Sequence, residues 1–336
     1  MGDEPFRLLD GKDILVTGGT GSFGRAFVRS VLARYSPNRV IIYSRGEFKQ
    51  AEFAEELSQK YKNVRFFIGD VRDERRLEMA MRGVNFVVHA AAIKHVSIAE
   101  YNPFECVKTN IIGTENVCRA AIQARVSRVV ALSTDKAASP INLYGASKLA
   151  ADKICIAANS MSGDIGTSFA VVRYGNVVAS SGSVVPLFRR LIKAGSKTLP
   201  VTDPRMTRFW ITLDKGVDFV LSSLEMMRGG EIFVPKIPSM KIVDLAEVIA
   251  PGIPHEFVGL RPGEKLHEVM ITTDDAPCTV EFPDRYVIEP QFPMWPYQSH
   301  LAQGIRRVKE AFHFSSDSNP EWLSDAEMLS MINGEC

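Results

Sequence analysis

The chain has 336 residues, of which 46% are hydrophobic and 24% are charged. This composition is typical of globular proteins and excludes the disordered and fibrous classes. The 40 Lys and Arg residues balance 39 Asp and Glu residues, so the chain lacks the positive field that draws proteins to nucleic acids. At about 100–200 residues per domain, the length fits one large domain or two.

The amino-terminal residues 1–12 are charged and lack the apolar stretch of a signal peptide. No apolar run reaches the ~18 residues that a membrane helix needs. The five cysteines are scattered, and neither they nor the six histidines follow a metal-ligand spacing. We therefore expect a cytoplasmic protein with reduced thiols, no metal, and no membrane or nucleic-acid partner.

Short apolar runs alternate with helical stretches in the first half of the chain. The expected strands are Asp13–Thr17, Arg39–Tyr43, Val64–Ile68, Phe86–Ala90, Arg128–Ser133 and Ser168–Arg173. Runs that are apolar almost throughout are typical of strands covered on both faces. Between the first two runs, Phe23, Phe27 and Val31 repeat at helical spacing. The alternation predicts an α/β fold with a doubly wound parallel sheet.

Beyond about residue 178, glycine and proline become frequent and the alternation weakens. Glu231–Val234 is another apolar run, and we expect it to return to the main sheet. The last stretch, Ser315–Cys336, is polar and acidic, which favours a surface tail. The expected division is a sheet domain at 1–178, completed by about 228–240, and a smaller substrate-binding lobe at 179–227 and 241–336.

A glycine-rich turn directly follows the first strand and opens the first helix. Gly18 permits a tight turn, Gly21 lets the backbone approach a pyrophosphate, and Gly24 allows close helix–strand packing. The free N–H groups at the helix start favour an anion. A merely structural glycine turn is the alternative. We predict a Rossmann domain that binds a dinucleotide. The residues of this turn expected at the cofactor are Gly18, Thr20, Gly21, Ser22, Phe23 and Gly24.

The end of the second strand selects between the two nicotinamide cofactors. A carboxylate there would bind the ribose hydroxyls of NAD. Instead, Ser44 is followed by Arg45, and Lys49 comes one helical turn later. Two cations suit a 2′-phosphate, so we predict NADP. Solvated cations at a helix start are the alternative, and Glu47 keeps NAD open.

Two further segments are expected to contact the cofactor. Asp70 follows the third strand and is placed to bond the adenine amine, while Val71 packs on the ring. Ala90, Ala91 and Ala92 follow the fourth strand and keep side chains small where the backbone passes the cofactor. A helix N-cap at Asp70 and simple helix packing of the alanines are the alternatives.

The end of the fifth strand carries Thr134, Asp135 and Lys136, and Tyr144 and Lys148 follow one helical turn apart. A lysine ammonium can hold the cofactor ribose and lower the tyrosine pKa, so that the tyrosinate accepts a proton from a sugar hydroxyl. Asp135 and Lys136 add an acid and a base, enough for elimination as well as oxidation. A capping aspartate and a surface lysine are the alternative.

Tyr144 and Lys148, at this distance from the glycine turn, resemble the pair of the extended short-chain dehydrogenases/reductases. The other motifs of the resemblance are Thr134–Ala138, Asn142–Lys148, Arg173–Val177, Thr202–Trp210 and Arg261–Glu268. As a set, from about Gly11 to Tyr286, they resemble the UDP-N-acetylglucosamine 4,6-dehydratases, specifically the C5-inverting enzymes that open pseudaminic-acid biosynthesis. Common nucleotide-sugar dehydratases carry Asp-Glu where this chain has Asp-Lys.

The resemblance implies a lyase with tightly bound NADP that is regenerated in each turnover. C4 of the sugar is oxidised, with Tyr144 as base and Thr134 bonding the oxygen. Lys136 then removes the C5 proton while Asp135 protonates the departing C6 hydroxyl. Hydride returns to C6 and C5 is reprotonated on the opposite face, giving UDP-2-acetamido-2,6-dideoxy-β-L-arabino-hexos-4-ulose. A homo-oligomer such as a hexamer is also implied.

Five residues are expected at the substrate. By resemblance, Lys94 lines the sugar site and Glu264 binds the uridine ribose. Asn176 offers an amide suited to the diphosphate or the sugar hydroxyls. Arg205 and Arg261 suit bidentate phosphate recognition. The alternatives are a solvated lysine, a turn asparagine and surface ion pairs.

Three other functions stay open at this point: a C5-retaining dehydratase, a nucleotide-sugar 4-epimerase, and a non-enzymatic NADP-binding sensor. Asp135 and Lys136 disfavour the epimerase, which loses no water. The intact Tyr144 and Lys148 disfavour the sensor. The sequence leaves undetermined the C5 configuration of the product, the oligomeric state, the glycan that the pathway feeds and the choice between NADP and NAD. It also leaves the protonation of Lys136 undetermined, since its neighbours and burial act in opposite directions.

Overall fold

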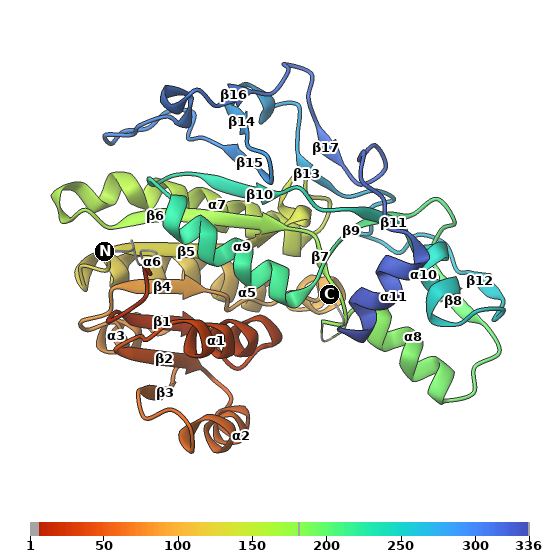
Figure 1. Ribbon diagram of the computed structural model, residues 1–336, viewed down its shortest axis with the longest axis horizontal. Coiled ribbons are helices and arrows are strands. Elements are labelled where there is room, and N and C mark those ends of the chain that lie inside the picture. Colours follow the sequence, from red (N-terminus) through yellow and green to blue (C-terminus); the bar gives the residue numbers. More distant parts are fainter. Residues whose placement is uncertain (1–6, 181, 335–336) are drawn as a thin grey trace, which may run out of the picture.

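The computed structural model describes residues 7–180 and 182–334, so the first six residues of the amino-terminal segment discussed above lie outside it. The parallel strands of its central sheet are β1 (Asp13–Thr17), β2 (Arg39–Ser44), β3 (Val64–Ile68), β4 (Phe86–His89), β5 (Arg128–Thr134), β6 (Ser168–Tyr174) and β10 (Ile232–Pro235). An antiparallel edge adds β15 (Arg285–Ile288), β14 (Thr279–Glu281) and β16 (Arg306–Arg307). Figure 1 shows the resulting order, β16-β14-β15-β10-β6-β5-β4-β1-β2-β3.

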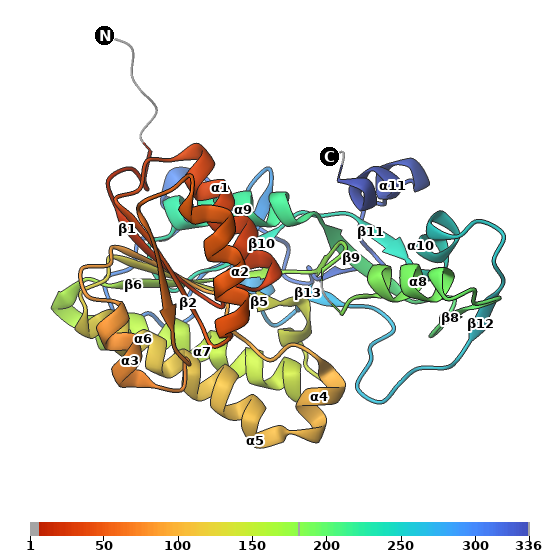
Figure 2. The same cartoon turned by 90° about the horizontal axis from the view of Figure 1, so that it is seen from below.

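Each of the six strands predicted in the first half is confirmed to within one residue. Most of their apolar side chains are buried because helices cover both faces of the sheet, as Figure 2 shows, whereas Ile68 on the edge strand β3 is 50% exposed. On one face lie α1 (Ser22–Arg34), α2 (Glu47–Ser58) and α9 (Leu213–Met226). On the other face lie α3 (Glu74–Ala80), α4 (Val96–Tyr101), α5 (Pro103–Cys106), α6 (Gly113–Gln123) and α7 (Leu143–Ser162). The doubly wound α/β fold is therefore confirmed.

A smaller lobe lies beyond the carboxyl ends of the parallel strands (Figure 1). Its sheet has the order β11-β9-β7. The bounds of these and the other lobe strands are β7 (Asn176–Val177), β8 (Leu199–Val201), β9 (Thr207–Ile211), β11 (Ser239–Lys241), β12 (His255–Phe257), β13 (Val269–Ile271) and β17 (Phe314–Ser315). Its helices are α8 (Val184–Lys193), α10 (Ile242–Ile249) and α11 (Asp325–Asn333). Trp210 and Phe188 are fully buried in a separate apolar core of this lobe.

Several segments belong to a different part of the fold than the predicted domain boundaries indicate. The predicted return of Glu231–Val234 to the sheet is observed, because β10 runs parallel to β6, with Ile232 opposite Val171. Helix α9 falls in the range 179–227 expected for the lobe, yet it packs against α1 on the sheet. Strands β14, β15 and β16 fall in the range 241–336 and extend the sheet. The division into two functional domains itself stays a prediction.

The prediction of a surface tail at Ser315–Cys336 is wrong for the described residues. Strand β17 pairs with β13, and α11 begins with a capping box formed by Ser324 and Glu327. Met328 is fully buried in the lobe core, and Met331 and Ile332 are nearly so. These apolar residues recur at helical spacing, so their burial outweighs the acidic composition of the segment.

Replacing Met328 with alanine is expected to lower the free energy of unfolding by about 2–5 kcal/mol, because it leaves a cavity in the lobe core. Leu329, its neighbour on α11, is 46% exposed, and its change to alanine is the matched control. Denaturant unfolding of both variants measures the difference. Equal losses for the two variants would contradict the burial of α11.

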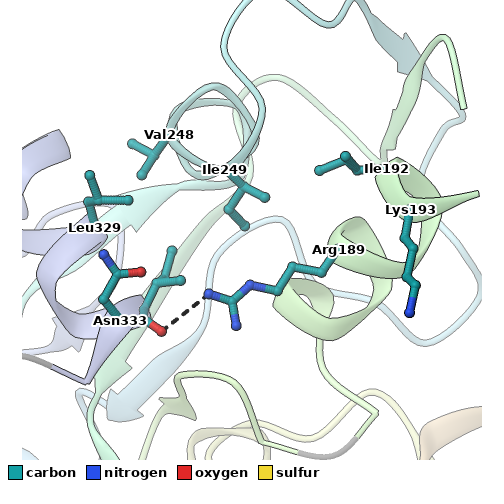
Figure 3. Close-up of a pocket in the computed structure, with 8 residues that line it drawn as sticks. Arg189, Ile192, Lys193, Val248, Ile249, Leu329 and Asn333 are labelled. Atoms are coloured by element: carbon teal, nitrogen blue, oxygen red, sulfur yellow. Dashed lines mark hydrogen bonds between the residues drawn. The ribbon is translucent and has the colours of Figure 1, made fainter. Parts of the chain in front are cut away.

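A hollow of about 370 Å³ lies between α8, α10 and α11 (Figure 3). Arg189 points across it and donates a hydrogen bond of 3.4 Å to the carbonyl of Ile332. The hollow shares no lining residue with the cleft described below. Within residues 7–180 and 182–334, no helix has the length and apolar character needed to cross a bilayer, and no His, Cys, Asp and Glu side chains group as a metal site.

Candidate active site

The glycine turn forms a close-packed cradle at the carboxyl end of β1. Gly18 has a φ of +65°, and a Cβ there would lie 2.9 Å from the backbone of Ala91. A Cβ on Gly24 would lie 2.5 Å from the Cα of Gly19. Side chains at these two positions would push the first turn of α1 away from β1 and β4. The N-cap of α1 is Gly21, which has no side chain that could accept a capping hydrogen bond from the first turn of the helix.

A cleft of about 630 Å³ opens beside this turn, which is a size suited to a nucleotide cofactor. The predicted cofactor residues that line it are Gly18, Thr20, Gly21, Ser44, Arg45, Lys49, Asp70, Val71, Ala90, Ala91 and Ala92. The predicted residues that do not line it are Ser22, Phe23, Gly24, Tyr144 and Lys148. Sequence reasoning missed five lining residues, which are Tyr43, Gly46, Phe48, Gly69 and Thr109.

Charged side chains gather at the part of this cleft that follows β2 and β3. Asp70 accepts hydrogen bonds from the Arg72 backbone N–H and from the Arg72 guanidinium, at 2.7–3.0 Å. Burial alone would raise the pKa of Asp70, but Arg72 outweighs it and lowers this pKa. Arg45 lies 3.7 Å from the same carboxylate and is 58% exposed. The helix N-cap considered for Asp70 is instead Asp73, which accepts from the N–H of Arg76.

The end of β5 brings an acid and an amine into direct contact. Asp135 is fully buried, and its Oδ1 accepts hydrogen bonds from the Thr134 hydroxyl at 2.9 Å and from Lys136 Nζ at 3.0 Å. Lys136 also reaches Asn176 Oδ1 at 3.5 Å and Glu268 Oε1 at 3.1 Å. The Lys136 side chain is 24% exposed, which differs from a freely solvated surface lysine.

The sequence left the protonation state of Lys136 undetermined, whereas the structure shows in which direction its pKa is shifted. Burial alone would lower its pKa, but the carboxylates of Asp135 and Glu268 outweigh burial and raise it above the ordinary lysine value. Lys136 is therefore an ammonium in the resting protein at neutral pH. One oxygen of each carboxylate, Asp135 Oδ2 and Glu268 Oε2, is buried without a hydrogen-bond partner among the described residues.

Tyr144 lies near the amino-terminal end of α7, within reach of this cluster. Burial raises its pKa to about 12, and the Lys136 ammonium and a hydrogen bond with Thr134 oppose that rise. The sequence assigned this effect on the tyrosine to Lys148, whereas the structure assigns it first to Lys136. Burial lowers the pKa of Lys148, which faces Asp152.

The five predicted substrate residues are not all brought together. Asn176, on β7, joins the catalytic cluster through Lys136. Lys94 lies in the loop between β4 and α4, where burial lowers its pKa. Arg205 is 71% exposed and forms a bidentate pair with Asp203, which is the surface ion pair considered as its alternative. Arg261 lies 3.7 Å from the Glu264 carboxylate.

A segment of the lobe docks on the start of α7. Asn142, the N-cap of α7, donates a hydrogen bond of 2.8 Å to the carbonyl of Gly263. Lys265 Nζ donates one of 2.7 Å to the carbonyl of Ala138. These contacts hold Gly263 and Lys265 of the lobe against the segment between the Asp135–Lys136 turn and α7.

Sequence reasoning assigned no role to Glu268, Arg208 or Lys265, although all three surround Lys136 or its partners. Each of the three lies in a motif on which the family resemblance rests, and membership of these motifs is the feature of the sequence that could have identified them. Their sequence spacing does not indicate that they lie near Lys136, because they are distant in the chain and only the folding of the lobe places them there.

Two relatives of this chain are named as enzymes that act on nucleotide sugars. A model of the family described as polysaccharide biosynthesis protein matches residues 14–290. A UDP-N-acetylglucosamine 4,6-dehydratase (inverting) of Campylobacter jejuni subsp. jejuni serotype O:23/36 (strain 81-176) is 54% identical over 331 residues, covering 97% of this chain and 98% of the relative. A UDP-glucose 4-epimerase of Rickettsia akari (strain Hartford) is 41% identical over 308 residues, 88% of each chain.

A solved structure gives the corresponding likeness in three dimensions. It is a dTDP-glucose 4,6-dehydratase of Streptomyces venezuelae with NAD and TYD bound. It is 26% identical, covers 76% of this chain and 86% of its own, and has a TM-score of 0.69. The chain belongs to the polysaccharide biosynthesis protein family, with the fold of the extended short-chain dehydrogenases/reductases.

Proposed function

We propose that the protein is a C5-inverting UDP-N-acetylglucosamine 4,6-dehydratase that uses NADP and supplies the first intermediate of pseudaminic-acid biosynthesis. The observation that carries the proposal is the contact of 3.0 Å between Asp135 and Lys136, beside Tyr144 at the carboxyl edge of the sheet. The inverting dehydratase at 54% identity supports it. We further propose that the protein works in the cytoplasm as a homo-oligomer such as a hexamer.

The cradle at Gly18 and the cleft beside it fit a dinucleotide. The N–H groups of α1 suit its pyrophosphate, and Arg45 and Lys49 suit a 2′-phosphate. When bound, the nicotinamide would supply hydride transfer to and from the sugar. Tyr144 and Lys148 are proposed to hold its nicotinamide end.

Tyr144 is proposed to accept the proton of the C4 hydroxyl. With a pKa near 12, the phenol is protonated in the resting protein, so the tyrosinate needs stabilisation. The Lys136 ammonium and the Thr134 hydroxyl favour the charged form of the phenol, although in the resting protein they do not outweigh burial. Thr134 is also placed to bond the C4 oxygen.

Elimination of water needs an acid and a base at once, and the pair of Asp135 and Lys136 holds one proton for both tasks. Transfer of this proton from Lys136 to Asp135 along their hydrogen bond gives a neutral amine and a carboxylic acid. The amine then removes the C5 proton, which the 4-ketone has made acidic. The acid protonates the C6 hydroxyl, which leaves as water as the C5–C6 double bond forms. The resting ion pair is thereby restored.

A nucleotide-sugar 4-epimerase is the second candidate, favoured by the relative at 41% identity. Such an enzyme needs Tyr144 but no acid–base pair for loss of water. Incubation of the protein with UDP-N-acetylglucosamine, followed by NMR, distinguishes the candidates. We expect a 4-keto-6-deoxy sugar with inverted C5. The same sugar with retained C5, a 4-epimer or unchanged substrate would each contradict the proposal.

The cofactor proposal makes a separate prediction. Replacing Arg45 with alanine is expected to weaken NADP+ binding about 10–100-fold and NAD+ binding far less, because only NADP+ carries the 2′-phosphate. Titration of both cofactors into the variant measures this. Arg65 is an exposed arginine of β3 outside the cleft, and its change to alanine is the control. A wild-type preference for NAD+ would refute the assignment.

A further inference from the structure

Glu268 is a buried carboxylate of the lobe that the proposed mechanism does not use. It directly precedes β13 and is only 2% exposed. Its backbone is fixed by Ser316, because the Glu268 N–H donates to the Ser316 hydroxyl at 3.0 Å and the Ser316 N–H donates back to the Glu268 carbonyl at 2.8 Å. A carboxylate that is buried and fixed in this way is destabilising unless an opposite charge lies close to it.

The main counter-charge of Glu268 is Lys136, whose Nζ lies 3.1 Å from Oε1. Arg208 and Lys265 lie further away, at 3.8 Å from Oε1 and 3.9 Å from Oε2. Lys136 therefore sits between two carboxylates, one from the sheet edge and one from the lobe. The second of these contacts exists because the lobe packs on the sheet edge and brings Glu268 to Lys136.

Groups from every neighbouring element set the charge around Lys136. They are Asp135 on the turn after β5, Tyr144 on α7, Asn176 on β7, Arg208 on β9, and Lys265 and Glu268 on the lobe segment before β13. Two carboxylates thus face three cations. Without the charge of Glu268, Asp135 alone would face Lys136, Arg208 and Lys265.

We propose that Glu268 is a positioning residue, which holds the Lys136 amine beside Asp135 and secures the proton that this pair shares. The inference rests on the proposed dehydratase function, since the shared proton matters only if Asp135 must deliver it to a leaving hydroxyl. If the pair loses this proton, Lys136 is still a base but Asp135 is no longer an acid, and dehydration stops. Glu268 keeps the proton bound at alkaline pH by attracting the ammonium form.

The test is the pH dependence of dehydration in the variant E268Q. Glutamine has nearly the same shape and still accepts a hydrogen bond from Lys136, but it carries no charge. Loss of an opposite charge at this distance shifts a titration by about 1–3 pH units. Because the pKa of Lys136 in the wild type lies above the ordinary lysine value, initial rates are measured from pH 6 to 11, and we expect the dehydration rate of E268Q to begin to fall about 1–3 pH units below the point where the wild-type rate falls.

The matched control is E289Q. Glu289 is another buried carboxylate, and it accepts hydrogen bonds of 2.7 Å from the Ser299 hydroxyl and the His300 N–H, away from Lys136. Loss of the Glu289 charge is expected to reduce the stability of the protein. It should not move the alkaline limb, which is the part of the pH profile where the dehydration rate falls as the pH rises. E268D keeps the charge but withdraws it by one methylene, so its limb should lie between those of E268Q and the wild type.

An alkaline limb of E268Q that coincides with that of the wild type would overturn the proposal. A uniform loss of rate at every pH, as a purely structural ion pair predicts, would do the same. If E268Q does not fold, E268D provides the test. An alkaline limb of E268D at the wild-type pH would then refute the positioning role of Glu268. Failure of the dehydratase proposal is recognised separately, because the wild type would then form no 4-keto-6-deoxy sugar.

Discussion

Replacing Lys136 with alanine is expected to slow dehydration of UDP-N-acetylglucosamine about 10²–10⁴-fold, the usual contribution of a positioned base. Exchange of the C5 proton with solvent should fall by a similar factor, because the variant has no amine to remove this proton. NADP+ affinity should change little, since Lys136 does not line the cleft of the glycine turn. NMR of the sugar in deuterium oxide and cofactor titration measure the two properties.

A lysine on the catalytic helix gives the control for this experiment. Lys153 lies on α7 with its side chain exposed, and its change to alanine should leave exchange and dehydration unchanged. Wild-type rates of exchange in K136A would remove Lys136 from the mechanism. Loss of cofactor binding in K136A would show that the substitution affects more than the removal of the C5 proton.

Replacing Asp135 with asparagine is expected to slow dehydration about 10²–10⁴-fold while exchange at C5 continues. Asparagine preserves the volume and an acceptor for Lys136 but has no acidic proton for the C6 hydroxyl. Removal of the carboxylate also lowers the pKa of Lys136, so the neutral amine becomes more available. Substrate recovered from deuterium oxide should therefore carry deuterium at C5 without loss of its C6 oxygen.

The contrast between the two variants separates the acid from the base. If D135N lost exchange as completely as K136A, the two residues would act as one base and the acid would lie elsewhere. If D135N dehydrated the sugar at the wild-type rate, Asp135 would be only a structural partner of Lys136. Asp275 is a partly exposed aspartate whose side chain bonds Thr272, and its change to asparagine is the control.

The central sheet could be predicted because its strands are apolar on both faces, which makes each of them a continuous run in the sequence. The glycine turn could be predicted because Gly18 and Gly24 occupy positions that tolerate no Cβ. The lobe was harder to predict, since its strands are short and its core depends on contacts between distant segments. Helix α11 was missed because net charge was weighed above the spacing of Met328, Met331 and Ile332.

The candidate site was predictable where its residues are neighbours in the chain. Asp135 and Lys136 are adjacent, and Tyr144 lies on the next helix, so one strand end brings them together. Glu268 was not predictable, because only the packing of the lobe places it 3.1 Å from Lys136. Glu268 adds to the effect of the adjacent Asp135 in raising the pKa of Lys136 against burial, and this contribution could not be seen in the sequence.

The most direct test is a crystal structure of the protein with cofactor and UDP-N-acetylglucosamine bound. We expect Lys136 Nζ within about 3.5 Å of C5 and a carboxyl oxygen of Asp135 within hydrogen-bond distance of the C6 hydroxyl. The free Asp135 Oδ2 is the oxygen available for this contact. A sugar bound with its C5 and C6 facing away from both side chains would contradict the account and leave only the reductase-type fold.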